Sequence, residues 1–375
     1  MTAGPGAVVY IPGSSWTGVA GTDRRLVTAL GTLVPVLWVD PPFSVLTPTR
    51  VGASEANRAG RSSVVPGITC LQTMAPPGVS RPGISSVAAW LVARGIRSSL
   101  AAAGTPATAI VLASASERFP AGVPGLRILY VTDDWPAGAK LMGLPIERVR
   151  AILDRNVRDA DVVAAVSPVL AGQLEQDYGV PVLVLPNGCE PNRALAAAAD
   201  TARAGLVGQL NERLDADILE AVRAGGTPLD VVGPRTDRDR VTRRQLDRLL
   251  TGEGVTWHGP VPFDELPARL ARMGVGLTPY ADSAFNRASF PLKMLEYLAA
   301  GLPVVSTDLP AVRWLDTDLI EVAQGPEDFA RRVREILARP ADPAERARRI
   351  AFAAGHSWNA RARQLLDILD SGAQA

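Results

Sequence analysis

Two α/β halves, each a doubly wound parallel sheet, are the fold that the sequence predicts. The chain has 375 residues, more than a single hydrophobic core usually serves. Short runs rich in β-branched residues alternate with stretches whose apolar residues recur at three-and-four spacing. This alternation is typical of βαβ units, and it occurs along the chain as two separate series.

The first series predicts an N-terminal domain over residues 1–186. Its β-branched runs predict strands at Val8–Ile11, Val36–Asp40, Ile68–Leu71, Ala109–Leu112, Ile128–Thr132, Val162–Val166 and Val182–Leu185. Its amphipathic stretches predict helices at Thr22–Leu30, Ser85–Ala102, Pro145–Asn156 and Pro168–Tyr178.

The second series predicts a C-terminal domain over residues 187–355. Its strands are expected at Leu206–Val207, Leu229–Val232, Val255–Trp257, Val275–Leu277, Val304–Ser306 and Leu319–Val322. Between the two series, Pro186-Asn187-Gly188 is followed by Pro191 and by Ala196–Ala199, and these residues favour a domain boundary. Because open α/β sheets bind ligands beyond the carboxyl ends of their strands, we expect the site in the loops that follow the strands.

The composition excludes several classes of function. Apolar residues make up 47% of the chain and charged residues 21%, as in soluble globular proteins. The net charge of +1 argues against a nucleic-acid-binding protein. Cys70 and Cys189 have no Cys or His neighbour at metal-ligand spacing, so we expect no metal site and no disulfide. No apolar run reaches the roughly 18 residues of a membrane span, and we expect a cytoplasmic protein.

The most specific motif is SFPLKMLEYLAAGLPVV, Ser289–Val305. It predicts a helix that begins near Pro291 and ends at Gly301. The N-terminus of a helix attracts anions, Lys293 adds a positive charge, and Glu296 one turn later can accept hydrogen bonds from ribose hydroxyls. The pattern therefore favours a nucleoside diphosphate site. The alternative is a surface helix on which Lys293 and Glu296 form an ordinary ion pair.

This motif resembles the donor-binding signature of GT-B glycosyltransferases related to bacterial mannosyltransferases and sucrose synthases. The fuller pattern, Pro-x-Lys-x-x-Glu-Tyr-Leu-Ala-x-Gly-x-Pro-Val-Val, is similar to a branch found in polysaccharide and teichuronic-acid biosynthesis. Three further segments resemble the family in order and spacing: Val184–Gly188 its domain connection, Leu206–Arg213 its first C-domain strand and loop, and Trp257–Val261 its nucleobase-side loop.

The resemblance implies a GT-B fold, two Rossmann-like domains that face an interdomain cleft. It also implies transfer of a sugar from a nucleoside diphosphate sugar, such as a UDP-sugar or GDP-sugar, to an acceptor hydroxyl with retention of anomeric configuration. The acceptor can be a glycan, a lipid-linked sugar or a small molecule, and weak contact with a membrane surface is compatible with it. No metal and no cofactor are implied.

The resemblance also implies roles for individual residues. Glu296 would hold the ribose, backbone near Val261 would contact the base, and Arg213 and Lys293 would stabilise charge on the leaving diphosphate. The full set of implied donor-binding residues is Glu296, Phe290, Pro291, Leu292, Gly208, Gln209, Asn211, Gly233, Pro260 and Val261.

Two departures from the family pattern concern catalysis more than fold. The acid that usually contacts the donor sugar stands eight positions before Glu296, where this chain has Ala288. The basic residue common after the first C-domain strand is Gln209. Because of these losses, one alternative function is that of a non-catalytic partner protein that binds a nucleotide sugar. A second alternative is a sugar-nucleotide epimerase, which would have the same fold.

The loop from Pro12 to Gly21 follows the first predicted strand. It is not a dinucleotide fingerprint, because Trp16 stands where the G-x-G-x-x-G pattern requires glycine. In the family this loop approaches the donor phosphates and the acceptor, which implicates Ser14, Ser15, Trp16 and Gly18. Trp16 is equally compatible with a place in the core.

Two acids, Asp133 and Asp134, end another predicted strand. Neighbouring carboxylates raise one another's pKa, so Asp134 is a candidate base or acceptor ligand. A His often occupies this region in the family. The alternative is that these acids cap local turns.

The chain ends in a predicted helix that begins at Ser357 and Trp358. Relatives use such a Ser-Trp helix to return to the N-terminal domain, and the resemblance implies this role for residues 356–375. The alternative is a plain C-terminal packing helix.

Overall fold

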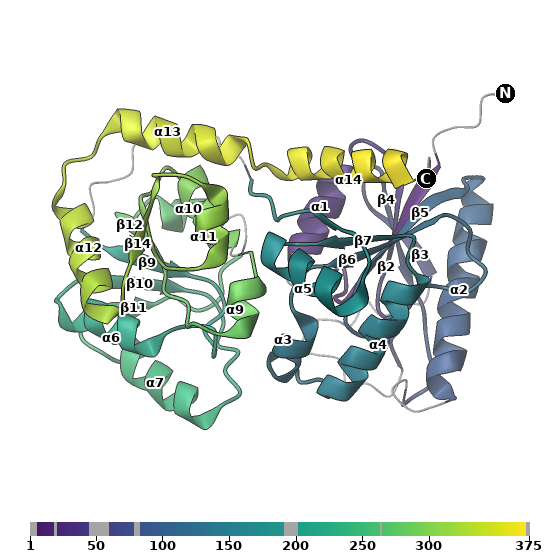
Figure 1. Ribbon diagram of the computed structural model, residues 1–375, viewed down its shortest axis with the longest axis horizontal. Coiled ribbons are helices and arrows are strands. Elements are labelled where there is room, and N and C mark those ends of the chain that lie inside the picture. Colours follow the sequence, from purple (N-terminus) through teal and green to yellow (C-terminus); the bar gives the residue numbers. More distant parts are fainter. Residues whose placement is uncertain are drawn as a thin grey trace. The chain divides into compact units, whose positions relative to one another are not determined.

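The chain folds into two compact α/β units, which together confirm the predicted fold class (Figure 1). The computed structural model describes residues 6–18, 21–44, 60–78, 83–190, 202–262, 265–290 and 292–372. Unit 1 comprises Met1–Val166, Leu170–Pro186 and Trp358–Ala375, and unit 2 comprises Ser167–Val169 and Asn187–Ser357. Pro191 and Ala196–Ala199, which favoured the domain boundary, lie outside the described residues.

Unit 1 is built on an eight-stranded sheet in the order β3-β4-β2-β1-β5-β6-β7-β8, parallel except for β3. Its strands are β1 (Ala7–Pro12), β2 (Val36–Val39), β3 (Gly60–Val65), β4 (Ile68–Gln72), β5 (Ala107–Ala113), β6 (Leu126–Val131), β7 (Val162–Ala165) and β8 (Val182–Val184). Its helices are α1 (Thr22–Leu30), α2 (Ile84–Ala103), α3 (Trp135–Met142), α4 (Ile146–Asp159), α5 (Pro168–Tyr178) and α14 (Trp358–Gly372). The central strands are buried on both faces, which is why they appear in the sequence as continuous apolar runs.

Two elements of unit 1 were not predicted. Strand β3 pairs antiparallel with β4 at the edge of the sheet, and its Arg61, Ser62 and Ser63 are exposed, so it lacks a β-branched run. Helix α3 is short, and the carboxylate of Asp134 caps it by accepting the backbone N–H of Ala137 at 3.0 Å.

Unit 2 is built on a six-stranded parallel sheet in the order β11-β10-β9-β12-β13-β14. Its strands are β9 (Ala204–Val207), β10 (Leu229–Val232), β11 (Val255–Trp257), β12 (Val275–Thr278), β13 (Val304–Thr307) and β14 (Ile320–Ala323). Its helices are α6 (Ala216–Ala224), α7 (Arg240–Leu250), α8 (Leu266–Leu270), α9 (Ala284–Ala288), α10 (Leu292–Ala299), α11 (Pro310–Leu315), α12 (Pro326–Ala338) and α13 (Pro343–Ala354). Apolar side chains of α6, α7 and α12, such as Leu219, Leu246 and Phe329, form the core on one face of this sheet.

The last helix, α14, belongs to unit 1, although the residues before it belong to unit 2. It packs against α1, and the side-chain amide of Gln364 donates to the carbonyl of Val184 at 2.9 Å. Near its end it approaches the sheet so closely that a Cβ on Gly372 would lie 2.8 Å from Leu126. The C-terminal segment is therefore an integral part of unit 1.

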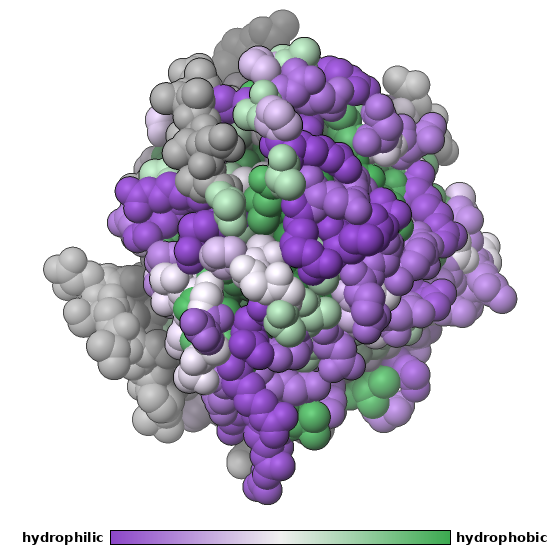
Figure 2. Space-filling model, turned by 90° about the vertical axis from the view of Figure 1, so that its left-hand side faces the viewer, coloured by the Kyte–Doolittle hydropathy of each residue, from purple (hydrophilic) through white to green (hydrophobic). Residues whose placement is uncertain are grey.

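The described surface of unit 2 on the side of α6 and α12 is mostly hydrophilic, with small hydrophobic areas (Figure 2). Charged pairs such as Arg331 with Glu335, 2.6 Å apart, account for this character on α12. None of the helices in the described ranges is both long enough and apolar enough to cross a membrane.

Candidate active site

Two glycines lie at the carboxyl ends of β9 and β10, where they expose backbone and no side chain. Gly208 and Gly233 follow these strands with φ of 140° and 141°. A Cβ on Gly233 would lie 1.8 Å from the carbonyl oxygen of Gly208, so no other residue fits there. A Cβ on Gly208 would lie 3.6 Å from Cε of Lys293. The predicted phosphate cation therefore lies beside a strand end that presents backbone only.

A buried tyrosine fixes α10 in this place. The hydroxyl of Tyr297 accepts the backbone N–H of Val207 at 2.8 Å and lies 3.2 Å from the carbonyl oxygen of Gly205, to which it donates. Its ring fits only because Gly276 has no side chain, since a Cβ there would lie 2.3 Å from Cγ of Tyr297. These contacts hold α10 against β9 and β12. Pro291, the predicted first residue of this helix, lies outside the described residues.

Lys293 and Glu296 form an ion pair on α10. Nζ of Lys293 lies 2.5 Å from Oε2 of Glu296. The side chains of Lys293 and Glu296 are only 20% and 9% exposed. The pair therefore differs from the ordinary ion pair on a surface helix that was the alternative interpretation of the motif. Taking both charges partly out of water costs free energy. The positive charge of Lys293 is compensated here by Glu296, so a phosphate would compete with that carboxylate.

Arg213 is held by neutral groups. Its guanidinium carbon lies 5.1 Å from the ring centre of Tyr280 and 4.9 Å from that of Phe285. Its Nε donates to Oδ1 of Asn286 at 2.9 Å. Among the described residues, no carboxylate forms an ion pair with Arg213. The site thus contains a half-buried cation, and no acid within the described ranges forms an ion pair with it.

Arg213 and the α10 pair lie around the same tyrosine. Burial is the main cause that raises the pKa of Tyr280, Arg213 lowers it, and the charge of Glu296 raises it further. Both charged residues therefore act on Tyr280 through space. The structure brings Arg213, Glu296 and Lys293 together at one edge of the unit 2 sheet.

The loop that carries Arg213 is ordered by a buried asparagine. Oδ1 of Asn211 accepts the backbone N–H of Arg213 at 3.1 Å, and Nδ2 donates to the hydroxyl of Thr236 at 3.1 Å. The side-chain oxygen of Gln209 lies 3.4 Å from that hydroxyl. Gln209 thus contributes a polar contact and no charge, so Arg213 and Lys293 stay the predicted phosphate-binding cations.

The remaining predicted donor residues differ in accessibility. Phe290 is buried, stacks edge-on against Trp314 at 5.6 Å, and its carbonyl accepts Nδ2 of Asn187 at 3.1 Å. Leu292 and Val261 are half-buried, and Pro260 is exposed on the loop after β11. Phe290 is therefore a packing residue in this structure, whereas the loop at Pro260 and Val261 is open to a ligand.

Ala288 stands where the family has the acid that contacts the donor sugar, and this position is buried. Ala288 is fully buried, at 0% exposure, and its carbonyl oxygen accepts the hydroxyl of Ser167. A carboxylate at this position would be desolvated. The packing of α9 therefore suits the small apolar side chain of Ala288 and not a carboxylate.

In unit 1, the loop after β1 is pinned through Trp16. The backbone N–H of Trp16 donates to the buried carboxylate of Asp40 at 2.7 Å, and its ring contacts Trp38 edge-on at 5.1 Å. The guanidinium of Arg24 lies 4.9 Å from the centre of the same ring. Trp16 is only 7% exposed, which agrees with the alternative that it is a core residue. Trp38 and Arg24 cover parts of its ring.

The rest of the loop is accessible. Ser14, Ser15 and Gly18 are exposed, and a turn joins the N–H of Gly18 to the carbonyl of Ser15 at 3.0 Å. The predicted approach to phosphate or acceptor would fall to these residues and to the loop backbone.

A carboxylate that was not predicted lies close to this loop. Asp23, in the first turn of α1, accepts a hydrogen bond from the hydroxyl of Tyr10 at 2.7 Å. Burial raises the pKa of Asp23 to about 6, with a contribution from the charge of Asp133 and against the effect of the Tyr10 hydrogen bond. The only sequence signal was an acid directly after a strand-end loop, which also fits an ordinary helix start.

The raised pKa of Asp23 predicts a pH-dependent stability. A carboxyl whose folded-state pKa exceeds its unfolded value stabilises the fold when protonated, and this contribution is lost as the pH rises from about 4 through about 6. Asp23→Asn keeps an acceptor for Tyr10, so it should raise the free energy of unfolding at pH 8 by about 1–2 kcal/mol and change little at pH 4. Urea unfolding at both pH values measures this. An equal effect at both would show that Asp23 is not desolvated in the folded state.

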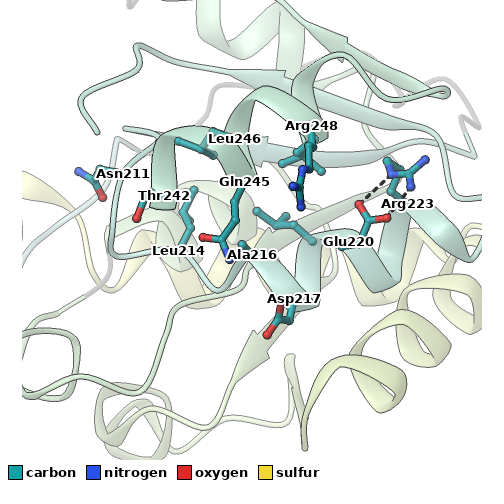
Figure 3. A pocket seen from close by; sticks show the side chains of 12 residues that line it. Asn211, Leu214, Ala216, Asp217, Glu220, Arg223, Thr242, Gln245, Leu246 and Arg248 are labelled. Carbon is teal, nitrogen blue, oxygen red and sulfur yellow. Dashed lines mark hydrogen bonds and ion pairs between the residues drawn. The ribbon is translucent and has the colours of Figure 1, made fainter. Parts of the chain in front are cut away.

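A pocket of about 320 Å³ lies between α6 and α7 (Figure 3). Asn211 stands at one end of its lining, and the ion pair of Glu220 with Arg223 stands at the other (Figure 3). Arg213, Lys293 and Glu296 do not line it. It is therefore a separate hollow from the candidate donor site.

Part of the chain is similar to a known protein family. Residues 203–339, which include both halves of the candidate donor site, match the family of glycosyl transferases group 1. A curated protein of Bacillus subtilis (strain 168), named as the teichuronic acid biosynthesis glycosyltransferase TuaH, is 30% identical over 181 residues, 47% of this chain and 45% of that protein. The chain thus spans about half the length of this relative.

Solved structures agree on the fold. A trehalose-6-phosphate structure from E. coli bound with UDP-2-fluoro glucose aligns with a TM-score of 0.66 at 15% identity, over 97% of this chain and 98% of that one. Anabaena Alr3699/HepE in complex with UDP and glucose aligns with a TM-score of 0.67 at 14% identity, over 97% of this chain and 99% of that one. The chain therefore has the GT-B fold. Residues 203–339 match the group 1 glycosyltransferase family, which supports the family resemblance seen in the sequence.

Proposed function

We propose that the protein transfers a sugar from a nucleoside diphosphate sugar to an acceptor hydroxyl with retention of anomeric configuration. The observation that carries the proposal is the half-buried, uncompensated Arg213 at the strand ends of unit 2, next to the Lys293–Glu296 pair. Such a cation stabilises negative charge as it develops on a leaving diphosphate. UDP in a GT-B neighbour and the teichuronic-acid relative support this donor class.

In the proposed reaction, the bond between the anomeric carbon and the diphosphate oxygen breaks, and a bond to the acceptor oxygen forms on the same face. The departing phosphate oxygen takes the acceptor proton, so the step needs no protein nucleophile. Arg213 binds the diphosphate, and Lys293 joins it when phosphate displaces Glu296. Glu296 then accepts hydrogen bonds from the ribose hydroxyls, and the loop at Pro260 and Val261 contacts the base.

The two alternative functions have unequal support. The buried methyl of Ala288 and the neutral Gln209 favour a non-catalytic protein that binds a nucleotide sugar. An epimerase would need an acid–base pair, but Nε2 of His258 lies 3.2 Å from Asp230 and Nδ1 lies 3.3 Å from Arg269. His258 is therefore engaged in a network of its own, and the first alternative is the stronger.

Two measurements test the proposal and separate these functions. A thermal-shift panel of UDP, GDP, ADP and dTDP should show one preferred diphosphate, because a ligand at 100 times its Kd adds about 2.7 kcal/mol of stability. Turnover of the matching nucleotide sugars with and without acceptors then decides the activity. Binding without turnover would support the partner protein, an epimerised donor would support the epimerase, and no binding would contradict all three.

We propose Asp134 as the residue on the acceptor side, and its structural contact suggests a specific variant for testing this role. Its carboxylate caps α3, and an asparagine can accept the same N–H of Ala137. Asp134→Asn should therefore leave stability and nucleotide affinity nearly unchanged and lower turnover about 10²-fold if the carboxylate contacts the acceptor. Steady-state kinetics with saturating donor measures this. Full activity would make Asp134 a helix cap only.

We also propose a weak membrane-surface contact through α2. Val87 and Trp90 on this helix are 47% and 54% exposed, and its charged residues are Arg94 and Arg97, with no acid. An exposed Trp beside basic residues suits the interface of an anionic membrane. Trp90→Ala should weaken cosedimentation with anionic phospholipid vesicles roughly threefold, and neutral vesicles should bind neither protein. Equal binding of both proteins to anionic vesicles would remove α2 from this role.

A further inference from the structure

Asn286 on α9 is positioned to present a single atom to Arg213. It is 1% exposed. Its Nδ2 donates to the carbonyl of Arg213 at 2.9 Å and to that of Ala281 at 2.8 Å. Both amide hydrogens are thereby used, which fixes the orientation of the amide. Its Oδ1 is left to accept Nε of Arg213 at 2.9 Å.

The backbone around Arg213 is fixed to the same region. The carbonyl of Arg213 also accepts the N–H of Ala281 at 2.9 Å, and the N–H of Asp215 donates to the carbonyl of Pro279 at 2.8 Å. The hydroxyl of Ser283 accepts the N–H of Asn286 at 3.2 Å, which caps α9. The backbone and Nε of Arg213 are thus held by neutral groups, and two aromatic rings lie close to its guanidinium.

The neutral partner sets Arg213 apart from many arginines of this chain. In the part of the chain that the structure describes, arginines that donate from Nε to a carboxylate oxygen include Arg155, Arg203, Arg223, Arg235, Arg243, Arg287, Arg313 and Arg332. An aspartate differs from Asn286 by one atom and would pair with Arg213 in the same way. It would neutralise the cation, and it would remove the two N–H donors that Asn286 supplies to the carbonyls of Arg213 and Ala281.

We infer that Asn286 is a positioning residue that holds Arg213 in place while leaving its charge available to the diphosphate of the donor. The inference rests on the proposed function. Asn286 orients the guanidinium through Nε, and the rings of Tyr280 and Phe285 restrict it, so the Nη groups remain for the phosphate oxygens. A neutral amide orients the cation as well as a carboxylate would, without competing with the ligand for its charge.

The test measures binding of inorganic pyrophosphate, UDP and uridine by calorimetry to the full chain. Asn286→Asp should weaken pyrophosphate and UDP at least about tenfold and leave uridine unchanged, because only the phosphate contact is lost. Gln245→Glu on α7 adds the same charge to the pocket between α6 and α7, which Arg213 does not line, and it should change none of the three affinities.

A double-mutant cycle separates positioning from mere structural support. In an Arg213→Ala background, Asn286→Asp should cause no further loss of pyrophosphate affinity, because the group it neutralises is absent. Equal losses in both backgrounds would overturn the inference. If Asn286→Asp does not fold, Asn286→Ala provides a second route, with an expected loss of roughly threefold in pyrophosphate affinity because Nε of Arg213 loses the acceptor that positions it.

Two failures can be told apart. Wild-type protein that binds neither pyrophosphate nor any nucleoside diphosphate of the panel would contradict the proposed function. Wild-type binding that depends on Arg213 but is unaffected by both Asn286→Asp and Asn286→Ala would contradict only the role of Asn286.

Discussion

Arg213→Ala and Lys293→Ala should each lower turnover on the order of 10²–10³ without changing the affinity for nucleoside. The cations make charge-assisted hydrogen bonds that strengthen as the leaving diphosphate gains charge. Arg213 should show the larger loss, because Lys293 must first leave Glu296, from which it lies 2.5 Å away. Steady-state kinetics with the preferred nucleotide sugar measures both effects.

Arg244→Ala supplies the matched control, since Arg244 is an exposed cation on α7 of the same unit. It should leave turnover unchanged. If Lys293→Ala retains full turnover and full preference for diphosphate over nucleoside, Lys293 is only the ion-pair partner of Glu296. If Arg213→Ala behaves in the same way, the donor site must be sought elsewhere.

Glu296→Ala should weaken the donor and the free nucleotide by the same factor, roughly 10- to 100-fold. The expected contact is to ribose and is made equally before and during the reaction, so KM should rise while kcat stays nearly constant. Hydrogen bonds to a charged group contribute about 1.5–3 kcal/mol, which gives this range. Calorimetry with the preferred diphosphate and its 2′-deoxy form measures it.

The deoxy ligand makes this test specific to ribose. Wild type should prefer the ribonucleotide, and Glu296→Ala should lose the preference. Glu296→Gln serves as the second variant, because it releases Lys293 in the same way but keeps one acceptor oxygen. Unchanged nucleotide affinity in Glu296→Ala would show that Glu296 only compensates the charge of Lys293.

Most of the fold could be predicted because its strands are buried on both faces. Such strands appear as continuous apolar runs, and the helices between them carry clear amphipathic patterns. Helix Thr22–Leu30 has the predicted bounds, and the strand at Val255–Trp257 does too. Strand Gly60–Val65 was missed because its residues face solvent and follow the pattern of a loop.

The site was less accessible to sequence reasoning. Lys293 and Glu296 stand on one helix, so their spacing alone predicted that they meet. Arg213 and Asn286 lie 73 residues apart, and only the pairing of a strand-end loop with a short helix joins them. No local pattern marks Asn286, Tyr280 or Phe285 as partners of a cation. The hydrogen bond between Tyr10 and Asp23 in unit 1 could not be predicted from a local pattern either, because it depends on how α1 packs on β1.

The affinity difference between nucleoside diphosphate and nucleoside, measured by calorimetry in wild type, Arg213→Ala and Lys293→Ala, tests the central claim most directly. We expect a strong preference for the diphosphate in wild type, a preference reduced at least about tenfold in each variant, and unchanged nucleoside affinity throughout. A wild-type protein that binds both ligands equally, or variants that keep the full preference, would contradict a diphosphate site at Arg213 and Lys293.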